Sequence, residues 1–212
     1  MRFIDAVARL EPLPDVLPAA SEALTTIVRT DGSWVRPSVP PDHRVTRPAS
    51  VLVLVFPDDA GEARLVLIER TSHDGHHSGE VSFPGGKAER GDADEAATAL
   101  REAAEEVALD PVAAGVRVVG ALEPFWIPVS DFQVTPIVAV ADRAPVLAPE
   151  PREVARILAP PLAAFLPDAP VDIVERTIRD WPLRFGAYSV DGLLVWGATA
   201  RVLSQLGQVV AG

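Results

Sequence analysis

Three glutamates lie on one face of the most strongly predicted helix in the chain. Residues 92–111 favour a helix because alanine and leucine dominate them. At about 100° per residue, Glu102, Glu105 and Glu106 fall within one sector of that helix. Like charges at these spacings repel one another, whereas Mg²⁺ and Mn²⁺ prefer carboxylate oxygens as ligands. The pattern therefore indicates either a metal site or the solvated face of an ordinary amphipathic helix.

The loop before this helix favours the metal site. Gly85 and Gly86 offer bare backbone that can approach a phosphate or present a carbonyl oxygen to a metal. Lys87, the single lysine of the chain, adds the compact positive charge that suits a diphosphate. In the alternative, Arg101 and Glu105 form an ordinary surface ion pair four residues apart.

Residues 83–109 resemble the Nudix box, a glycine–loop–helix signature that ends in Arg-Glu-x-x-Glu-Glu. All four charged positions of that ending are present: Arg101, Glu102, Glu105 and Glu106.

This segment departs from the general pattern at two points. The interval between the last glycine of the loop and Arg101 is one residue longer, with Asp92 where glutamate is usual. Ala108 stands where the pattern has glycine.

The resemblance implies hydrolysis of a diphosphate linkage with Mg²⁺ or Mn²⁺ as cofactor. It implies Glu102 and Glu106 as the main metal ligands, helped by the carbonyl oxygen of Gly86. Glu105 is a further ligand or the general base, and Arg101 orients it.

A carboxylate from a later loop is the other candidate ligand or base. Glu153 is preferred over Glu150 for this role. A helix-start position favoured by the helix dipole explains Glu153 equally well.

Residues 66–86 resemble the extra motif that precedes the box in coenzyme A diphosphatases. Arg70 and Gly79 fit this motif, whereas Gly75 stands where it has a second basic residue. The resemblance implies cleavage of coenzyme A or acyl-CoA into 3′,5′-ADP and (acyl-)4′-phosphopantetheine. The residues that it implies in substrate binding are Arg70, His77, Gly85, Gly86 and Lys87.

Two alternatives remain open. Gly75 favours ADP-ribose or another nucleoside diphosphate derivative as substrate. A catalytically silent nucleotide-binding Nudix module is the second alternative, although three mutually repelling glutamates argue against it.

Strands and helices alternate irregularly around these motifs. Asp92 or Asp94 caps the central helix. The mixture predicts an α+β fold, and the resemblance implies a Nudix-type α/β/α sandwich with a mixed β-sheet. Strands are predicted at 50–56, 63–70, 81–83, 116–125, 132–141, 172–180, 184–190 and 193–197. Helices or helical turns are predicted at 17–29, 151–158, 161–166 and 198–206.

The resemblance divides the chain into a Nudix hydrolase domain, residues 47–212, and an N-terminal extension, residues 1–46, packed on it. The tryptophans at 181 and 196 are expected in the core. The histidines at 73, 76 and 77 are expected to be polar loop residues, with His77 contacting phosphate.

The composition excludes several classes of protein. A formal charge of −11 leaves no general basic patch for nucleic acid, and the absence of cysteine excludes disulfides and thiolate zinc sites. No apolar run approaches the roughly 20 residues of a membrane span, and the first residues do not resemble a signal peptide. We expect a soluble cytoplasmic protein, monomeric or homodimeric, that binds a small anionic substrate and neither nucleic acid nor membrane.

Overall fold

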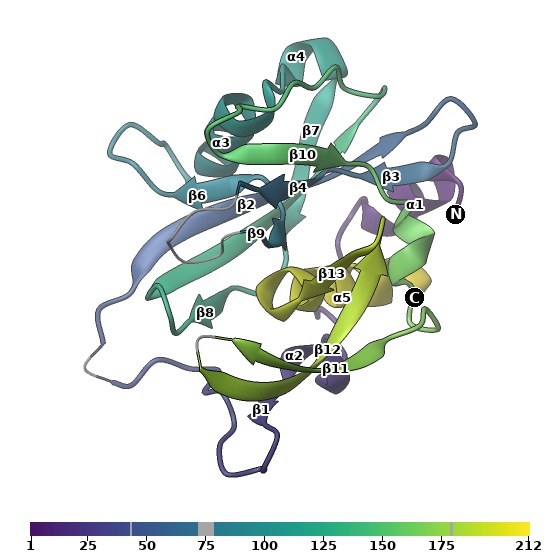
Figure 1. Ribbon diagram of the computed structural model, residues 1–212. Helices are drawn as coiled ribbons and strands as arrows, with labels where there is room; N and C mark the ends of the chain where they lie inside the picture. Colours follow the sequence, from purple (N-terminus) through teal and green to yellow (C-terminus); the bar gives the residue numbers. More distant parts are fainter. Residues whose placement is uncertain (43, 72–78, 179) are drawn as a thin grey trace.

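The computed structural model describes residues 1–212 apart from 43, 72–78 and 179 (Figure 1). His77 and Gly75 therefore lie outside the described residues. The helices are α1 (Phe3–Leu10), α2 (Glu22–Thr25), α3 (Glu95–Val107), α4 (Pro111–Ala114), the 3₁₀ helix η1 (Leu162–Phe165) and α5 (Gly197–Ala211). The strands are β1 (Ile27–Arg29), β2 (Arg47–Pro57), β3 (Ala63–Leu65), β4 (Leu67–Arg70), β5 (Val81–Ser82), β6 (Gly85–Lys87), β7 (Val116–Ala121), β8 (Phe125–Ile127), β9 (Phe132–Ala141), β10 (Val154–Leu158), β11 (Asp172–Ile178), β12 (Trp181–Val190) and β13 (Leu193–Trp196).

A mixed sheet of six strands forms the centre of the fold. Its main order is β3-β2-β9-β7, with β6 paired to β2 and β8 paired to β9. The pair β2–β9 is parallel and the others are antiparallel. Three strands, β10-β4-β5, form a smaller sheet, and β1, β11, β12 and β13 form a third.

The apolar run of β2 is buried on both faces of the central sheet. Successive side chains of a strand point to opposite faces. Leu52, Leu54 and Phe56 pack with the apolar side of α3, whereas Val53 and Val55 join the cluster that includes α5. This arrangement of helix, sheet and helix confirms the predicted α+β sandwich with a mixed sheet.

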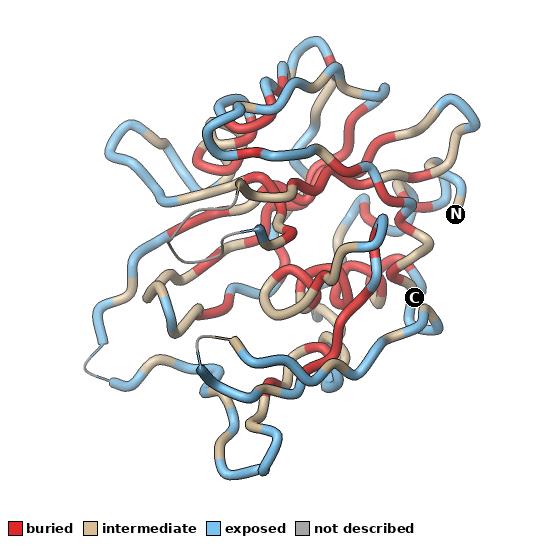
Figure 2. The backbone as a smooth tube through the Cα atoms, in the orientation of Figure 1, coloured by how far each residue is buried: buried red, intermediate tan, exposed pale blue. Residues whose placement is uncertain are grey.

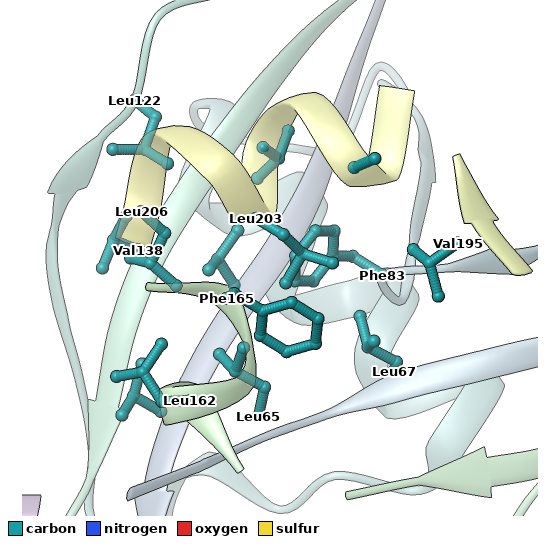
Figure 3. Close-up of a cluster of buried hydrophobic side chains, with 14 of the residues drawn as sticks. Leu65, Leu67, Phe83, Leu122, Val138, Leu162, Phe165, Val195, Leu203 and Leu206 are labelled. Carbon is teal, nitrogen blue, oxygen red and sulfur yellow. The ribbon is translucent and has the colours of Figure 1, made fainter. Parts of the chain in front are cut away.

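The larger core surrounds α5. Figure 3 shows Leu203 and Leu206 of this helix among side chains from the strands and from η1, with Phe165 at the centre. Burial follows the same layers in Figure 2, where the buried segments lie in the middle of the molecule and the loops are exposed. No helix among the described residues is long and apolar enough to cross a membrane.

Two of the predicted helices are wrong. Residues 151–158 contain β10, which pairs with β4, so the helical spacing of their apolar residues is overridden by sheet pairing. Within 17–29 only Glu22–Thr25 is helical. The β-branched residues that follow form β1, in which Ile27 pairs with Phe185 of β12.

The predicted core position of Trp181 is also wrong. Its side chain is 42% exposed. Trp181 stands at the first position of β12, at the margin of the third sheet, where no core layer covers it.

The end of α3 offers a test of local strain. Ala108 caps α3 at its C-terminus with φ 54°, in the left-handed region that favours glycine. We expect Ala108→Gly to raise the free energy of unfolding by about 0.5–1 kcal/mol, because relief of this strain exceeds the entropy that glycine adds to the unfolded chain. Urea unfolding followed by circular dichroism measures this difference, and an unchanged or lower midpoint would contradict it.

Candidate functional site

Helix α3 carries the glutamates of the site, and the side chain of Asp94 fixes where this helix begins. Asp94 accepts a hydrogen bond from the backbone N–H of Ala97 at 2.7 Å, so Asp94 is the N-cap and Asp92 is not. The helix buries Ala99, Ala103 and Val107 against the central sheet. This orientation leaves the glutamates along the side that faces β4 and β6.

Glu106 is the most buried carboxylate of the site, with 2% of the residue exposed. Its Oε1 lies 3.0 Å from Nη1 of Arg70, and its Oε2 accepts a hydrogen bond from the Gly85 N–H at 2.9 Å. Burial raises the pKa of Glu106 to about 7, although the Gly85 N–H and Arg70 act in the opposite direction. The negative charge of Glu102 adds to the increase. A further positive charge nearby would therefore stabilise the ionised form of Glu106.

The two glycines of β6 lie in close contacts. Gly85 has φ 154°, and a Cβ atom there would lie 2.4 Å from the carbonyl oxygen of Ser50. A Cβ atom on Gly86 would lie 2.5 Å from Oε2 of Glu102. Strand β6 thus brings the backbone of Gly85 against β2, where only glycine fits, and the backbone of Gly86 against the Glu102 carboxylate of α3.

Arg101 connects the loop with two of the glutamates. Its Nη1 lies 3.0 Å from Glu102 Oε1 and 3.0 Å from Glu105 Oε2. Its Nε and Nη2 donate to the two carboxylate oxygens of Asp92 at 3.0 and 3.1 Å, and Nη2 also donates to the Lys87 carbonyl oxygen at 3.0 Å. A guanidinium with this many partners is held in one place.

Asp92 is the functional residue that the sequence interpretation missed. It accepts hydrogen bonds from the Thr98 hydroxyl and the Glu89 N–H, each at 2.9 Å, as well as from Arg101. The Arg101 guanidinium beside it holds the pKa of Asp92 well below its usual range. The signal in the sequence was a carboxylate nine residues before Arg101, at the position where the resemblance has glutamate.

Glu102 and Glu105 differ in their environment. The Glu102 side chain is 14% exposed, whereas that of Glu105 is 60% exposed. Burial raises the pKa of Glu102, against the pull of Arg101, and the negative charges of Glu105 and Glu153 raise it further. Glu105, Glu106 and Glu153 are therefore each close enough to Glu102 for the charges to repel.

Glu153 reaches the site from the loop before β10. Its Oε2 lies 4.0 Å from Nη2 of Arg70, and its carbonyl oxygen accepts the Thr71 N–H at 2.9 Å. Glu150 is the weaker candidate. Its backbone carbonyl oxygen accepts hydrogen bonds from the N–H groups of Glu153 and Val154. Arg70 thus stands between Glu106 and Glu153.

Lys87 lies at the margin of this arrangement. Its side chain is 66% exposed, and Nζ lies 3.7 Å from Glu89. Phe125 and Trp126, by contrast, are each only 8% exposed and belong to the interior.

The donor atoms suit a hard divalent cation. Carboxylate oxygens from one helical face, with a backbone carbonyl beside them, are the ligands that Mg²⁺ and Mn²⁺ prefer. Among residues 1–42, 44–71, 79–178 and 180–212, no three carboxylate or imidazole groups already converge on one point. Arginines instead neutralise the glutamates: Arg70 contacts Glu106, and Arg101 contacts Glu102 and Glu105. The residues fit a cation by their chemistry. Burial raises the pKa of Glu102 and Glu106, and a bound cation would stabilise their charged forms.

Comparison with known families finds a match over the part of the chain that contains these glutamates. A family model described as the NUDIX domain matches residues 46–177, more than half of the chain.

Several curated proteins are similar in sequence. The chain is 40% identical over 171 residues to "Nudix hydrolase 22, chloroplastic" and 37% identical over 180 residues to "Nudix hydrolase 15, mitochondrial", both from Arabidopsis thaliana. These matches cover 76% and 80% of this chain but only 55% and 60% of the two plant proteins. A protein of Pectobacterium atrosepticum, "Uncharacterized Nudix hydrolase NudL", is 35% identical over 193 residues, which cover 90% of this chain and 96% of that protein.

Two solved structures share the fold. The Nudix hydrolase RenU from M. smegmatis superposes with a TM-score of 0.53 over 88% of this chain and 94% of its own, at 18% identity. A MutT/nudix family protein from Enterococcus faecalis gives a TM-score of 0.50 at 15% identity, over 82% of this chain and 65% of its own. These similarities confirm the predicted fold class.

Proposed function

Because the chain belongs to the NUDIX domain family, we propose that it is a hydrolase that splits a diphosphate linkage. The observation that carries this proposal is the grouping of Glu102, Glu105 and Glu106 on α3 beside the glycines of β6. The overall reaction is X–P–P–Y plus water to X–P and Y–P.

We propose Mg²⁺ or Mn²⁺ as the cofactor. Glu102 and Glu106 would hold it, with the Gly86 carbonyl oxygen and with Glu105 as a further ligand or the base. When bound, the cation supplies charge neutralisation for the diphosphate and lowers the pKa of a water molecule. The approach of Gly86 to the Glu102 carboxylate supports this set of ligands.

The remaining residues would position these groups. Arg101, fixed by Asp92, holds Glu105 at 3.0 Å and sets the direction of its carboxylate. Arg70 contacts Glu106 and lies near Glu153, so it would turn to substrate phosphate when a cation takes over Glu106. Glu153 is the second candidate for the base because it is 55% exposed and reaches the same site from another element.

We propose coenzyme A or an acyl-CoA as the substrate, with 3′,5′-ADP and (acyl-)4′-phosphopantetheine as products. The support is the resemblance of residues 66–86 to the motif of coenzyme A diphosphatases, in which Arg70 and Gly79 fit. In the structure Arg70 lies at the glutamates, where that motif would bring the substrate. Gly75, in place of the expected basic residue, favours ADP-ribose as the second candidate.

A panel of diphosphates tests this proposal. We expect coenzyme A to yield 3′,5′-ADP when Mg²⁺ or Mn²⁺ is present. Chromatography measures the formation of this product. A preference of tenfold or more for ADP-ribose would replace the substrate, and tight binding without cleavage of any diphosphate would indicate a silent nucleotide-binding module.

We also propose that residues 47–212 are the hydrolase domain and residues 1–46 an extension packed on it. The extension is tied to α5, since the Ser21 N–H donates to the Ser204 hydroxyl at 2.9 Å and the Gln205 amide donates to the Pro18 carbonyl at 3.0 Å. Ser204 and Gln205 are both buried, so these bonds are partly shielded from water.

A further inference from the structure

One face of the third sheet collects aromatic rings and arginines outside the diphosphate site. In antiparallel pairs, directly opposite residues share a face, and alternate residues of a strand do too. Trp181, Leu183, Phe185 and Ala187 of β12 therefore lie on one face. Strand pairing adds further residues to this face: Ile27 and Val174 opposite Phe185, Arg29 and Arg176 opposite Leu183, and Trp196 and Asp172 opposite Ala187.

The hairpin that follows β1 extends the same face. The Arg29 N–H donates to the Trp34 carbonyl, and the Arg36 N–H donates to the Ile27 carbonyl. Trp34 and Arg36 therefore stand opposite Arg29 and Ile27. We call the group Arg29, Trp34, Arg36, Trp181, Phe185 and Trp196 the aromatic face.

Ring contacts confirm this placement and order the side chains. Trp34 meets Trp181 edge to face, with ring centroids 5.4 Å apart, and the Arg29 guanidinium lies 4.1 Å above the Trp181 ring. Phe185 and Trp196 stack at 4.6 Å. Within the described residues, the buried Nε of Arg29 has no hydrogen-bond acceptor.

The two faces of this sheet differ in what covers them. On the opposite face, Tyr188 and Val190 join the main core, and Gly186 lies against the backbone of Ala23 in α2. On the aromatic face Trp181 is 42% exposed, and Trp34 and Trp196 are half-buried. The aromatic face is therefore partly open.

Strand β5 connects the chain segment that follows Trp196 with the diphosphate site. The Thr199 hydroxyl, three residues after Trp196, donates to the Val81 carbonyl oxygen at 2.9 Å. The neighbouring Glu80 accepts the Arg70 N–H at 3.0 Å through its carbonyl oxygen. Burial lowers the pKa of the half-buried Arg36, and the charge of Glu80 opposes that effect, so Arg36 lies near this same residue. A ligand that spans both regions would pass along β5.

We propose that the aromatic face binds the nucleotide end of the substrate, an adenine base carrying a phosphate. The proposal rests on the function proposed above and extends it to residues 27–36, which lie outside the matched family region. Exposed indole rings stack on a nucleobase, and guanidinium groups bind phosphate as charge-assisted donors. The Arg29 guanidinium, 4.1 Å above the partly exposed Trp181 ring, suits such an anion, in a protein whose net charge is −11.

Equilibrium binding of adenosine 3′,5′-bisphosphate, measured by calorimetry without metal, tests this subsite directly. We expect Arg29→Ala, Arg36→Ala and Trp181→Ala each to weaken binding by about tenfold or more, since each removes a charged or stacking contact. Arg184→Ala is the matched control, because Arg184 is exposed on the same strand but on the opposite face. Equal dissociation constants in all four variants and the parent protein would overturn the proposal.

Three further measurements separate the loss of a nucleotide contact from the loss of folding or of a dimer. Arg29→Lys keeps the charge and should retain more affinity than Arg29→Ala, and urea unfolding shows whether each variant is folded. If sedimentation shows a dimer that Trp181→Ala dissociates while nucleotide affinity is unchanged, the face is a contact between two copies and the proposal is overturned.

Coenzyme A turnover separates this proposal from the proposed function. We expect Arg36→Ala to raise KM for coenzyme A by about tenfold with kcat within about threefold, because Arg36 lies away from the reacting atoms. Cleavage of coenzyme A with unchanged KM in this variant would refute the subsite and leave the function. Binding of the bisphosphate at the aromatic face without any cleavage of coenzyme A would support the subsite and refute the substrate.

Discussion

Glu106→Gln is expected to lower kcat for diphosphate hydrolysis by on the order of 10²–10³-fold while the protein stays folded. Glutamine has the shape of glutamate and still accepts the Gly85 N–H, but it supplies no negative charge to a cation. Steady-state hydrolysis with Mn²⁺ measures the loss. Glu95→Gln is the matched control, since Glu95 is an exposed residue of the same helix.

Metal binding gives a readout besides activity. We expect Mn²⁺ to raise the Tm of the parent protein and of Glu95→Gln, and to have a smaller effect on Glu106→Gln. A Glu106→Gln protein with near-normal turnover and an undiminished Mn²⁺ effect would refute the assignment of Glu106 as a ligand.

The same variant changes the pH dependence of stability in metal-free protein. The pKa of Glu106 is raised to about 7 in the fold, so the folded chain holds this proton more tightly than the unfolded chain does. The contribution of Glu106 to stability therefore falls as pH rises from about 4.5 to about 7. Urea unfolding across this window should show that fall in the parent protein, and a reduced fall in Glu106→Gln.

Gly85→Ala is expected to lower the free energy of unfolding by roughly 2–4 kcal/mol. Its Cβ atom would lie 2.4 Å from the Ser50 carbonyl oxygen and 2.6 Å from the Val51 Cα, and both are backbone atoms that cannot turn aside. Separation of β6 from β2 would also withdraw the N–H that Glu106 accepts, so activity should fall with stability.

Gly91→Ala is the matched control for Gly85→Ala. Gly91 belongs to the same loop region, and a Cβ atom there meets nothing within 4 Å. Urea unfolding of the two variants measures the difference. Equal midpoints would contradict the backbone contact on which the prediction depends.

The glutamate cluster was predictable because it is local. Glu102, Glu105 and Glu106 share one helix, so the helical repeat alone fixes their relative directions. The apolar runs at 50–56 and 132–141 likewise predicted two strands, and the structure confirms them as β2 and β9.

The partners of those glutamates could not be predicted in the same way. Arg70 is 36 positions away from Glu106 in sequence, and only the pairing of β4 with β10 brings it and Glu153 to α3. Residues 151–158 have an apolar spacing that fits a helix, yet β4 supplies a strand edge that they join instead. Tertiary pairing decided these elements, and no local pattern encodes it.

The parallel alignment of β2 with β9 has a consequence for how the chain reaches its native state. Arg47 pairs with Phe132 and Val55 with Val140, so the central pair of strands joins segments that are far apart in the sequence. During synthesis the apolar run of β2 therefore has no parallel partner until residues 132–141 have been translated. Pairing between such distant segments slows folding, and until it occurs an apolar, aggregation-prone strand edge stays exposed. The hairpin with β3, which follows at once, protects one edge of β2 through that interval.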